Sequence, residues 1–252
     1  MIRFATGFLL LFIVVLLGCS SGEPSKTPSE AGATRAGRTN AGTEEEDAPD
    51  REEPKPVLER RGTEKGEPKQ VNLMEYMTAQ GTKVRVSADH DPWADRVVSF
   101  RPGKPAAKQC TTPETTLGKP DYKLSIQGKT CLSLGHGGEL VVEFVDNRLI
   151  DGPGDDLVIF EVGPVIEPMN LAISTTGEIW ITLGQLKGAR CSVDIEPFVR
   201  SAQESKLLPE TPRPEFRFVR VTDAKAGLSN NSQKPGADID AIGALNSIPA
   251  AP

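Results

Sequence analysis

A short acidic loop offers the clearest chemistry in this 252-residue chain. The segment Asp146–Asp156 carries several carboxylates around the turn residues Gly152, Pro153 and Gly154. The glycines permit positive φ and the proline fixes its own φ, so we expect a tight loop. Crowded carboxylates repel one another, and Ca2+ bound through carboxylate and carbonyl oxygens would relieve that repulsion. The loop is no EF-hand, because Leu149 falls at a ligand position. The alternative is a solvated acidic turn whose Asp residues cap their own backbone.

A second acidic pair, Asp238 and Asp240, brackets Ile239 late in the chain. Side chains two residues apart in a strand share a face, so these carboxylates are predicted to point together while Ile239 enters the core. We predict that the two segments converge on one calcium ion held by Asp151, Asp156 and this pair. The alternative is a strand whose outer face is in water.

Catalytic patterns find little support in the sequence. Ser99 and Ser133 have no Gly-x-Ser-x-Gly setting, and His136 lies in a glycine-rich turn without a recognisable partner. A glycosidase needs two carboxylates that flank the bond to be cleaved. Carboxylates on strands are expected to point outward into water, because side chains alternate between the two faces of a strand. The carboxylates that leave this possibility open are Glu139, Glu143, Glu161 and Glu178. We therefore predict a protein that is not an enzyme.

The elements that would position these residues are short strands separated by turns. Period-two alternation or short apolar runs predict strands over 83–87, 139–145, 157–160, 171–174, 179–182, 216–221 and 239–245. The segment Ile195–Ala202, opened by Asp194, is the one predicted helix. This pattern is typical of an all-β domain, a β-sandwich or jelly roll, over residues 71–252.

Three cysteines lie within this domain, Cys110, Cys131 and Cys191. No C-x-x-C pair is present, so a zinc site is not expected. The apolar stretch over 8–17 that precedes Cys19 is typical of an export signal, and an exported protein meets oxidising surroundings, which favours one disulfide. We predict Cys110–Cys131, because these residues bracket a polar loop with few apolar anchors. Pairing of either residue with Cys191 remains the alternative.

At the start of the chain, Arg3 precedes an apolar stretch over 8–17 that ends in the string Leu16-Leu17-Gly18-Cys19. This arrangement resembles the export signal and lipobox of a bacterial lipoprotein. The stretch has about ten residues, whereas a membrane-spanning helix needs roughly 20. The resemblance implies that residues 1–18 are a removed signal peptide and that Cys19 is lipidated and anchors the protein. The alternative is an ordinary cleaved signal with a chance cysteine. Ser20 stands where an Asp usually retains such proteins in the inner membrane, which favours the outer membrane.

Residues 19–70 are predicted to be a disordered tether that follows the anchor. Apart from alanines, Val57 and Leu58 are the aliphatic residues that follow Ser20 in this stretch. Such a composition cannot bury enough apolar surface to offset the loss of backbone entropy. The formal net charge is −6 and no basic patch is present, so nucleic-acid binding is not expected.

Several motifs occur in order in the folded part, over 94–100, 102–103, 117–121, 151–161 and 236–241. Together they resemble a family of bacterial cell-surface domains similar to galactose-binding-like (discoidin-like) jelly rolls. The resemblance implies a jelly roll with a structural calcium ion and with ligand-binding loops at one end. That family usually has Ser-x-Asp-Gly before a Trp. Here the turn has the sequence Ser174-Thr175-Thr176-Gly177 before Trp180, so the resemblance assigns it no ligand role.

Two functions follow from these observations. The first is an outer-membrane lipoprotein that presents a binding module for a glycan or an envelope protein. The second is a structural or assembly subunit of an envelope complex without a small-molecule site. Aromatic platforms stack on sugar rings, so a binding module predicts that Trp93, Tyr122 or Trp180 is exposed, whereas a structural sandwich would bury both tryptophans.

Overall fold

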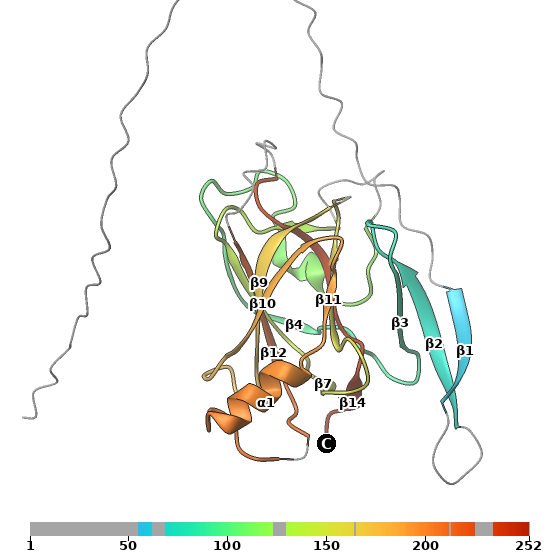
Figure 1. Cartoon of the computed structure of the whole chain (residues 1–252). Coiled ribbons are helices and arrows are strands. Elements are labelled where there is room, and N and C mark those ends of the chain that lie inside the picture. The colour runs from blue at the N-terminus through green and yellow to red at the C-terminus, as the bar shows by residue number, and fades with distance from the viewer. Residues whose placement is uncertain are drawn as a thin grey trace, which may run out of the picture. The chain divides into compact units, whose positions relative to one another are not determined.

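The computed structural model describes residues 55–61, 69–122, 130–163, 165–211, 213–224 and 234–251 (Figure 1). These residues form antiparallel sheets and a single α-helix, which confirms the predicted all-β sandwich. Within the described part, no helix is long and apolar enough to cross a membrane. The predicted signal peptide, Cys19 and most of the tether lie outside the described residues.

Two sheets form the body of the sandwich. The larger has the order β10-β9-β12-β6-β4 and consists of Ile181–Gly188, Ile166–Ser174, Phe218–Asp223, Glu139–Glu143 and Arg96–Arg101. The smaller has the order β11-β8-β13-β5 and consists of Ser192–Val193, Leu157–Glu161, Asp238–Ala244 and Leu132–Ser133. All pairings are antiparallel, as expected of a sandwich whose sheets face water on one side.

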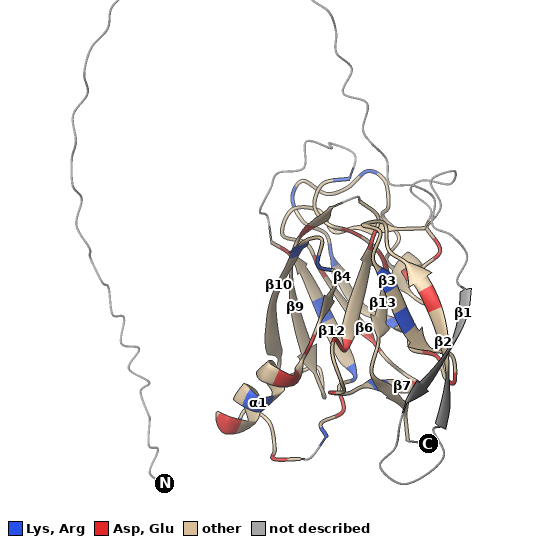
Figure 2. Ribbon diagram, turned by 45° about the vertical axis from the view of Figure 1, so that its right-hand side comes forward, with Lys and Arg blue, Asp and Glu red and all other residues tan. Residues whose placement is uncertain are grey.

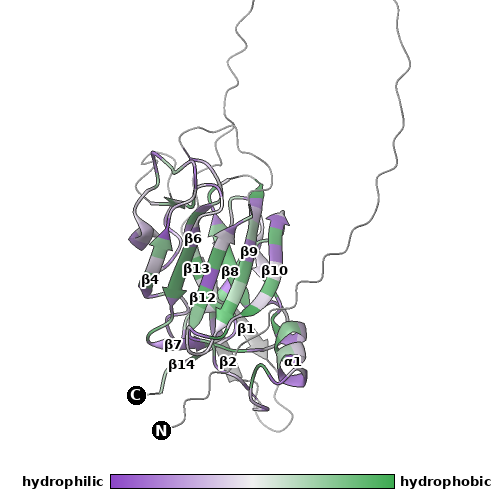
Figure 3. Ribbon diagram, turned by 90° about the vertical axis from the view of Figure 1, so that its left-hand side faces the viewer, coloured by the Kyte–Doolittle hydropathy of each residue, from purple (hydrophilic) through white to green (hydrophobic). Residues whose placement is uncertain are grey.

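The core lies between these two sheets and follows from their alternation. On β12, Val219 and Val221 are fully buried, whereas Phe218 and Arg220 are partly exposed. On β8 every residue is buried, as the continuous apolar run over 157–160 predicts for an inner strand. Figure 3 shows β6, β9 and β13 as mainly hydrophobic, while hydrophilic bands interrupt β12. The outer face of β12 is therefore available for a function other than packing.

An additional sheet, β1-β2-β3, consists of Lys55–Arg61, Lys69–Met77 and Lys83–Ser87. Strand β1 lies within the stretch assigned to the tether, so the predicted boundary at residue 71 is wrong. The backbone of β1 pairs with β2 along its whole length, from Lys55 opposite Glu75 to Arg61 opposite Lys69. Strand β1 therefore forms because a partner strand supplies its hydrogen bonds. Composition alone cannot reveal a strand that depends on a partner for its hydrogen bonds.

The remaining elements close the ends of the sandwich. The 3-10 helix Pro113–Thr116 precedes β5, and β14 (Ser247–Pro249) pairs with β7 (Asn147–Leu149). Helix α1 spans Glu196–Glu204, close to its predicted range. The helix N-cap is Ile195, without a side-chain cap, so the predicted capping by Asp194 is wrong; the Asp194 carboxylate instead accepts the N–H of Glu196 at 2.9 Å just before the helix.

Candidate functional site

The three aromatic residues singled out by the sequence differ in exposure. Trp93 and Tyr122 are buried, at 5% and 2% exposed. Trp93 packs edge-on against Tyr76 and Phe160, with ring centroids 5.2 and 5.7 Å away, so it serves the core. Trp180 alone of these three is partly exposed, and it borders a pocket. Trp93 therefore serves packing, whereas part of Trp180 is open to solvent.

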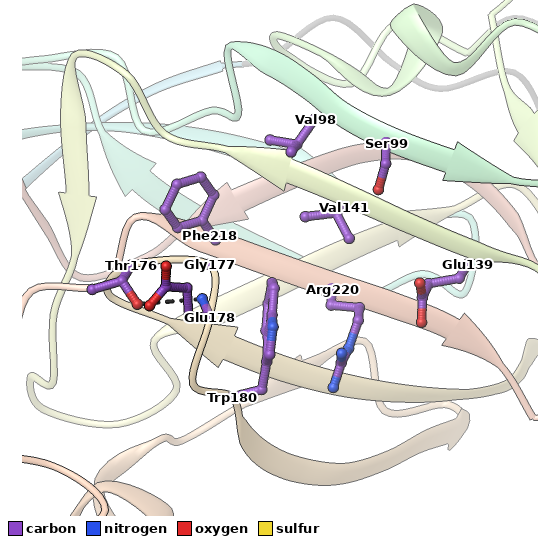
Figure 4. Close-up of a pocket in the computed structure, with 10 residues that line it drawn as sticks. All are labelled: Val98, Ser99, Glu139, Val141, Thr176, Gly177, Glu178, Trp180, Phe218 and Arg220. Atoms are coloured by element: carbon purple, nitrogen blue, oxygen red, sulfur yellow. Dashed lines mark hydrogen bonds between the residues drawn. The ribbon is translucent and has the colours of Figure 1, made fainter. Parts of the chain in front are cut away.

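The Trp180 pocket lies on the outer face of the five-stranded sheet and has a volume of about 420 Å³ (Figure 4). Residues from strands β4, β6 and β12 and from the β9–β10 connection contribute to it. They are Val98, Ser99, Glu139, Val141, Thr176, Gly177, Glu178, Trp180, Phe218 and Arg220. The pocket therefore combines apolar surface with carboxylates, hydroxyls and one guanidinium.

Strand alternation explains how the chain places these side chains together. Val141 faces Arg220 across the β6–β12 pair, so both project from the same outer face. A register shift between Val97 and Ser99 marks a bulge in edge strand β4. Val98 occupies this bulge and is 49% exposed, so an apolar side chain lies at the rim of the pocket.

The β9–β10 turn forms another side of the Trp180 pocket. Ser174 Oγ accepts the N–H of Gly177 at 2.9 Å, and Gly177 adopts φ of +86°, which favours glycine. This turn carries the chain to Trp180 just before β10 begins. Thr176, Gly177 and Glu178 of this turn line the pocket, although the resemblance assigns the turn no ligand role.

A buried carboxylate organises the sheet beside the pocket. Glu143 on β6 is fully buried and forms ion pairs with Arg96 on β4 and Arg217, which precedes β12. The guanidinium of Arg217 lies over the ring of Phe218, 5.4 Å from its centroid. Figure 2 shows basic and acidic residues interspersed over the strands in that view. Glu143 thus joins three neighbouring strands and holds the arginine that packs on a pocket residue.

The acidic loop forms a second candidate site at one end of the sandwich. Asp156 is fully buried, and its carboxylate accepts N–H groups from Gly152 at 2.8 Å and Ile195 at 2.9 Å. The Asn246 side chain donates to the same carboxylate at 2.8 Å. A Cβ on Gly152 would lie 2.5 Å from Asn246, so this glycine permits the close approach. Asp156 therefore shapes the loop, as the Gly-Pro-Gly turn predicts.

Three carboxylates meet at this loop. Oxygens of Asp151, Asp156 and Asp194 lie within 4.8 Å of one another, a spacing that one cation could bridge. Burial raises the pKa of Asp156 to about 6, against the hydrogen bonds that it accepts. Burial and the neighbouring Asp194 also raise the pKa of Asp151. The sequence did not single out Asp194 as a ligand, because a capping residue has an ordinary structural role.

Asp238 and Asp240 do not join this cluster, so the predicted four-residue convergence is wrong. Strands β8 and β13 are antiparallel: Ile239 faces Glu161 at one end and Ala244 faces Leu157 at the other. Asp156 precedes the far end of the pair, so the two acidic segments lie at opposite ends of the same strands. Sequence alternation cannot reveal this, because it does not contain the strand register.

The two aspartates also differ from each other. A register shift between Ile239 and Ala241 places Asp240 in a bulge, which interrupts the alternation that predicted a shared face. Asp240 is buried and accepts the N–H groups of Asp121 and Tyr122 at 3.3 and 3.1 Å. The Asp238 carboxylate lies 3.9 Å from the Lys234 ammonium, which places a positive charge beside it.

Near Asp238 the fold concentrates further acidic groups. Glu161 is buried at 1% exposed and accepts the N–H of Glu167 at 3.2 Å. Burial raises the pKa of Glu161 well above its usual value, and the charges of Glu167 and Asp238 add to the effect. The pKa of Glu167 is raised to about 7, again mainly by burial.

The predicted disulfide is present between Cys110 and Cys131, with Cα atoms 5.0 Å apart. Both cysteines are completely buried, and they form a small apolar cluster with Tyr122 and Val162. Cys191 is buried elsewhere and does not take part in the bond.

No protein-family model, curated protein or solved structure matches this chain.

Proposed function

We propose that this chain is a surface lipoprotein whose β-sandwich is a non-catalytic glycan-binding module. A lipid on Cys19 would anchor it to the outer membrane, and the Trp180 pocket would bind the ligand. One observation carries the proposal: Trp180 is partly exposed beside an apolar-floored pocket, while Trp93 and Tyr122 are buried in the core.

The composition of the pocket matches the chemistry of a sugar. A sugar ring has an apolar C–H face that packs on aromatic and aliphatic side chains, and hydroxyls that need hydrogen-bonding partners at its edge. Val141, Phe218 and Trp180 supply the apolar surface. Glu178 and Arg220 supply an acceptor and a donor beside it. Because these groups lie on regular strands and a tight turn, the site is largely preformed, which reduces the entropic cost of binding.

A glycan array with the purified full chain tests this function. We expect saturable binding to a subset of glycans, and we expect Trp180→Ala to weaken it at least about tenfold, equivalent to about 1.4 kcal/mol. Ile179→Ala is the matched control, because this neighbour is 51% exposed and apolar but does not line the pocket. Absence of binding to every glycan, or equal loss in both variants, would contradict the proposal and favour the structural role.

We further propose that Ca2+ stabilises the acidic loop through Asp151, Asp156 and Asp194. The support is the approach of these carboxylates to within 4.8 Å in a loop whose shape Asp156 already fixes. An ion that binds only the folded state would stabilise it by about 2.7 kcal/mol at a hundredfold excess over Kd.

Thermal unfolding in millimolar Ca2+ and in chelator tests the calcium proposal. We expect a higher Tm with Ca2+, and we expect Asp151→Asn to abolish the difference without removing the hydrogen bonds of Asp156. Asp238→Asn is the control and should retain the calcium effect, because Asp238 lies at the other end of β13. Identical melting curves for the parent protein in Ca2+ and chelator would refute the site.

A further inference from the structure

Arg220 differs from the other arginines on the outer face of the five-stranded sheet. Arg96 and Arg217 share Glu143, and Arg101 pairs with Glu139 at 3.1 Å. No carboxylate of the described residues lies within ion-pair distance of Arg220. Its guanidinium lies over the ring of Trp180 instead, 4.4 Å from the centroid. A partly buried positive charge thus lines the pocket without a carboxylate to neutralise it.

The contact with Trp180 prepares this guanidinium for a ligand. An arginine over an aromatic ring is attracted by the ring electrons, yet its N–H donors at the edge remain able to form hydrogen bonds. Figure 4 shows the two side chains alongside each other, with Val141 and Phe218 nearby. Guanidinium is also weakly hydrated compared with ammonium, so its partial burial costs less than that of a lysine side chain. The donors that remain match the two oxygens of a carboxylate.

The two carboxylates of the pocket do not neutralise Arg220. Glu139 is paired with Arg101, so its charge is already compensated. Glu178 is exposed on the turn, where water and salt screen its charge. A ligand that carries its own carboxylate would therefore meet an available cation next to an apolar surface.

We infer that the Trp180 pocket binds an acidic glycan, with a sugar carboxylate on Arg220 and the sugar ring on Val141, Phe218 and Trp180. This inference rests on the proposed function and adds the charge of the ligand to it. It predicts that the protein binds an acidic sugar more tightly than a neutral sugar of the same size and linkage in which a CH2OH group replaces the carboxylate.

Calorimetry with matched oligosaccharides tests the inference on the purified full chain. The probes are tetramers of galacturonate, mannuronate, guluronate and glucuronate, each compared with its carboxyl-reduced neutral form. We expect at least one acidic tetramer to bind about tenfold or more tighter than its neutral partner, equivalent to about 1.4 kcal/mol. Raising the salt concentration should lower the affinity for the acidic tetramer and leave the affinity for the neutral tetramer unchanged.

Variants separate the charge from the rest of the pocket. Arg220→Met keeps an apolar stem, and it should lower the affinity for the acidic tetramer to that for the neutral one. Arg200→Met removes the same charge from the exposed helix α1 and should change neither affinity. Trp180→Ala should lower the affinity for both tetramers.

The outcomes distinguish the inference from the proposed function. Equal affinity for acidic and neutral tetramers, with loss of both in Trp180→Ala, would overturn the acidic ligand and leave the glycan-binding site intact. Unchanged binding of the acidic tetramer in Arg220→Met would also overturn it. Failure of all eight tetramers would overturn the inference, and failure of the whole glycan array would overturn the proposed function as well.

Discussion

At the level of single residues, Glu161 and Glu167 are carboxyl groups whose proton affinity is changed by the fold. Both lie near Asp238, and burial is the main cause that raises each pKa. The ordinary value for Glu167 is 4.5, and in the folded protein it is about 7. Below pH 4.5 both states are protonated at this residue. Between pH 4.5 and about pH 7 the folded state retains a proton on Glu167 that the unfolded state has lost, so the free energy of unfolding falls as the pH rises.

Glu167→Gln should therefore raise stability at pH 8 and change it little at pH 5. Glutamine resembles the neutral carboxylic acid, so it removes the cost of ionising this position. We expect a gain on the order of 1 kcal/mol, since one pKa unit corresponds to about 1.4 kcal/mol and partial exposure reduces the effect. Urea unfolding at the two pH values measures it. The same change in stability at both values would show that ionisation of Glu167 is not its cause.

At the level of elements, Glu143 connects strands β4, β6 and β12 through ion pairs with Arg96 and Arg217. The partners differ in exposure: Glu143 is fully buried, while the arginine side chains are 61% and 41% exposed. The cost of breaking the pairs should therefore depend on which charge remains. A buried carboxylate that loses its counter-ions destabilises the folded protein more than arginines that lose theirs, because the exposed arginine side chains can be solvated by water.

Glu143→Gln should cost about 1.5–3 kcal/mol, the range for lost hydrogen bonds to charged groups. The double variant Arg96→Met and Arg217→Met should cost about 3–5 kcal/mol, because it leaves Glu143 buried without a counter-ion. Methionine preserves the apolar stems that cover the carboxylate. Denaturant unfolding compares the two proteins. A larger cost for Glu143→Gln would contradict the electrostatic account.

The disulfide anchors another element, the polar segment between Cys110 and Cys131, which are 21 residues apart. Cys110→Ser should lower the free energy of unfolding by about 3 kcal/mol, mainly through greater freedom of the unfolded chain. Cys191→Ser is the control and should leave the disulfide intact in a non-reduced peptide map. A map that places Cys191 in the bond would overturn the assignment.

Local patterns predicted many of these elements, and the same patterns could not predict how they meet. The strand over 83–87, the buried run over 157–160 and the hairpin around Thr176 all follow from periodicity and turn residues, and the structure confirms them. The calcium ligand set failed because β8 and β13 run antiparallel with a bulge at Asp240. Such register depends on the whole sheet rather than on nearby residues.

The Trp180 pocket shows the same limit at the site. Alternation along 216–221 places Phe218 and Arg220 on one face, so the sequence held a signal for these two residues. It held no signal that Val141 of β6 faces Arg220, or that Val98 occupies a bulge. Those relations arise only when β4, β6 and β12 form one sheet.

At the level of the whole molecule, the proposal joins a lipid anchor, a tether and a binding module. Such a design would hold the Trp180 pocket away from the membrane surface. It predicts that Cys19→Ser accumulates as a soluble or uncleaved protein that is absent from the outer-membrane fraction. Cell fractionation with a high-salt wash measures this, with Ser20→Ala as the control that keeps the cysteine. Recovery of the Cys19→Ser protein in the washed outer membrane would contradict the anchor.

The central claim, that the partly exposed tryptophan marks the binding site, has a direct spectroscopic test. The chain contains two tryptophans, so its 1H–15N NMR spectrum should show two indole N–H signals, which Trp180→Phe would assign. On titration with a glycan identified on the array, we expect the Trp180 signal to shift saturably while the signal of buried Trp93 stays in place. Binding that leaves the Trp180 signal unchanged would contradict the account.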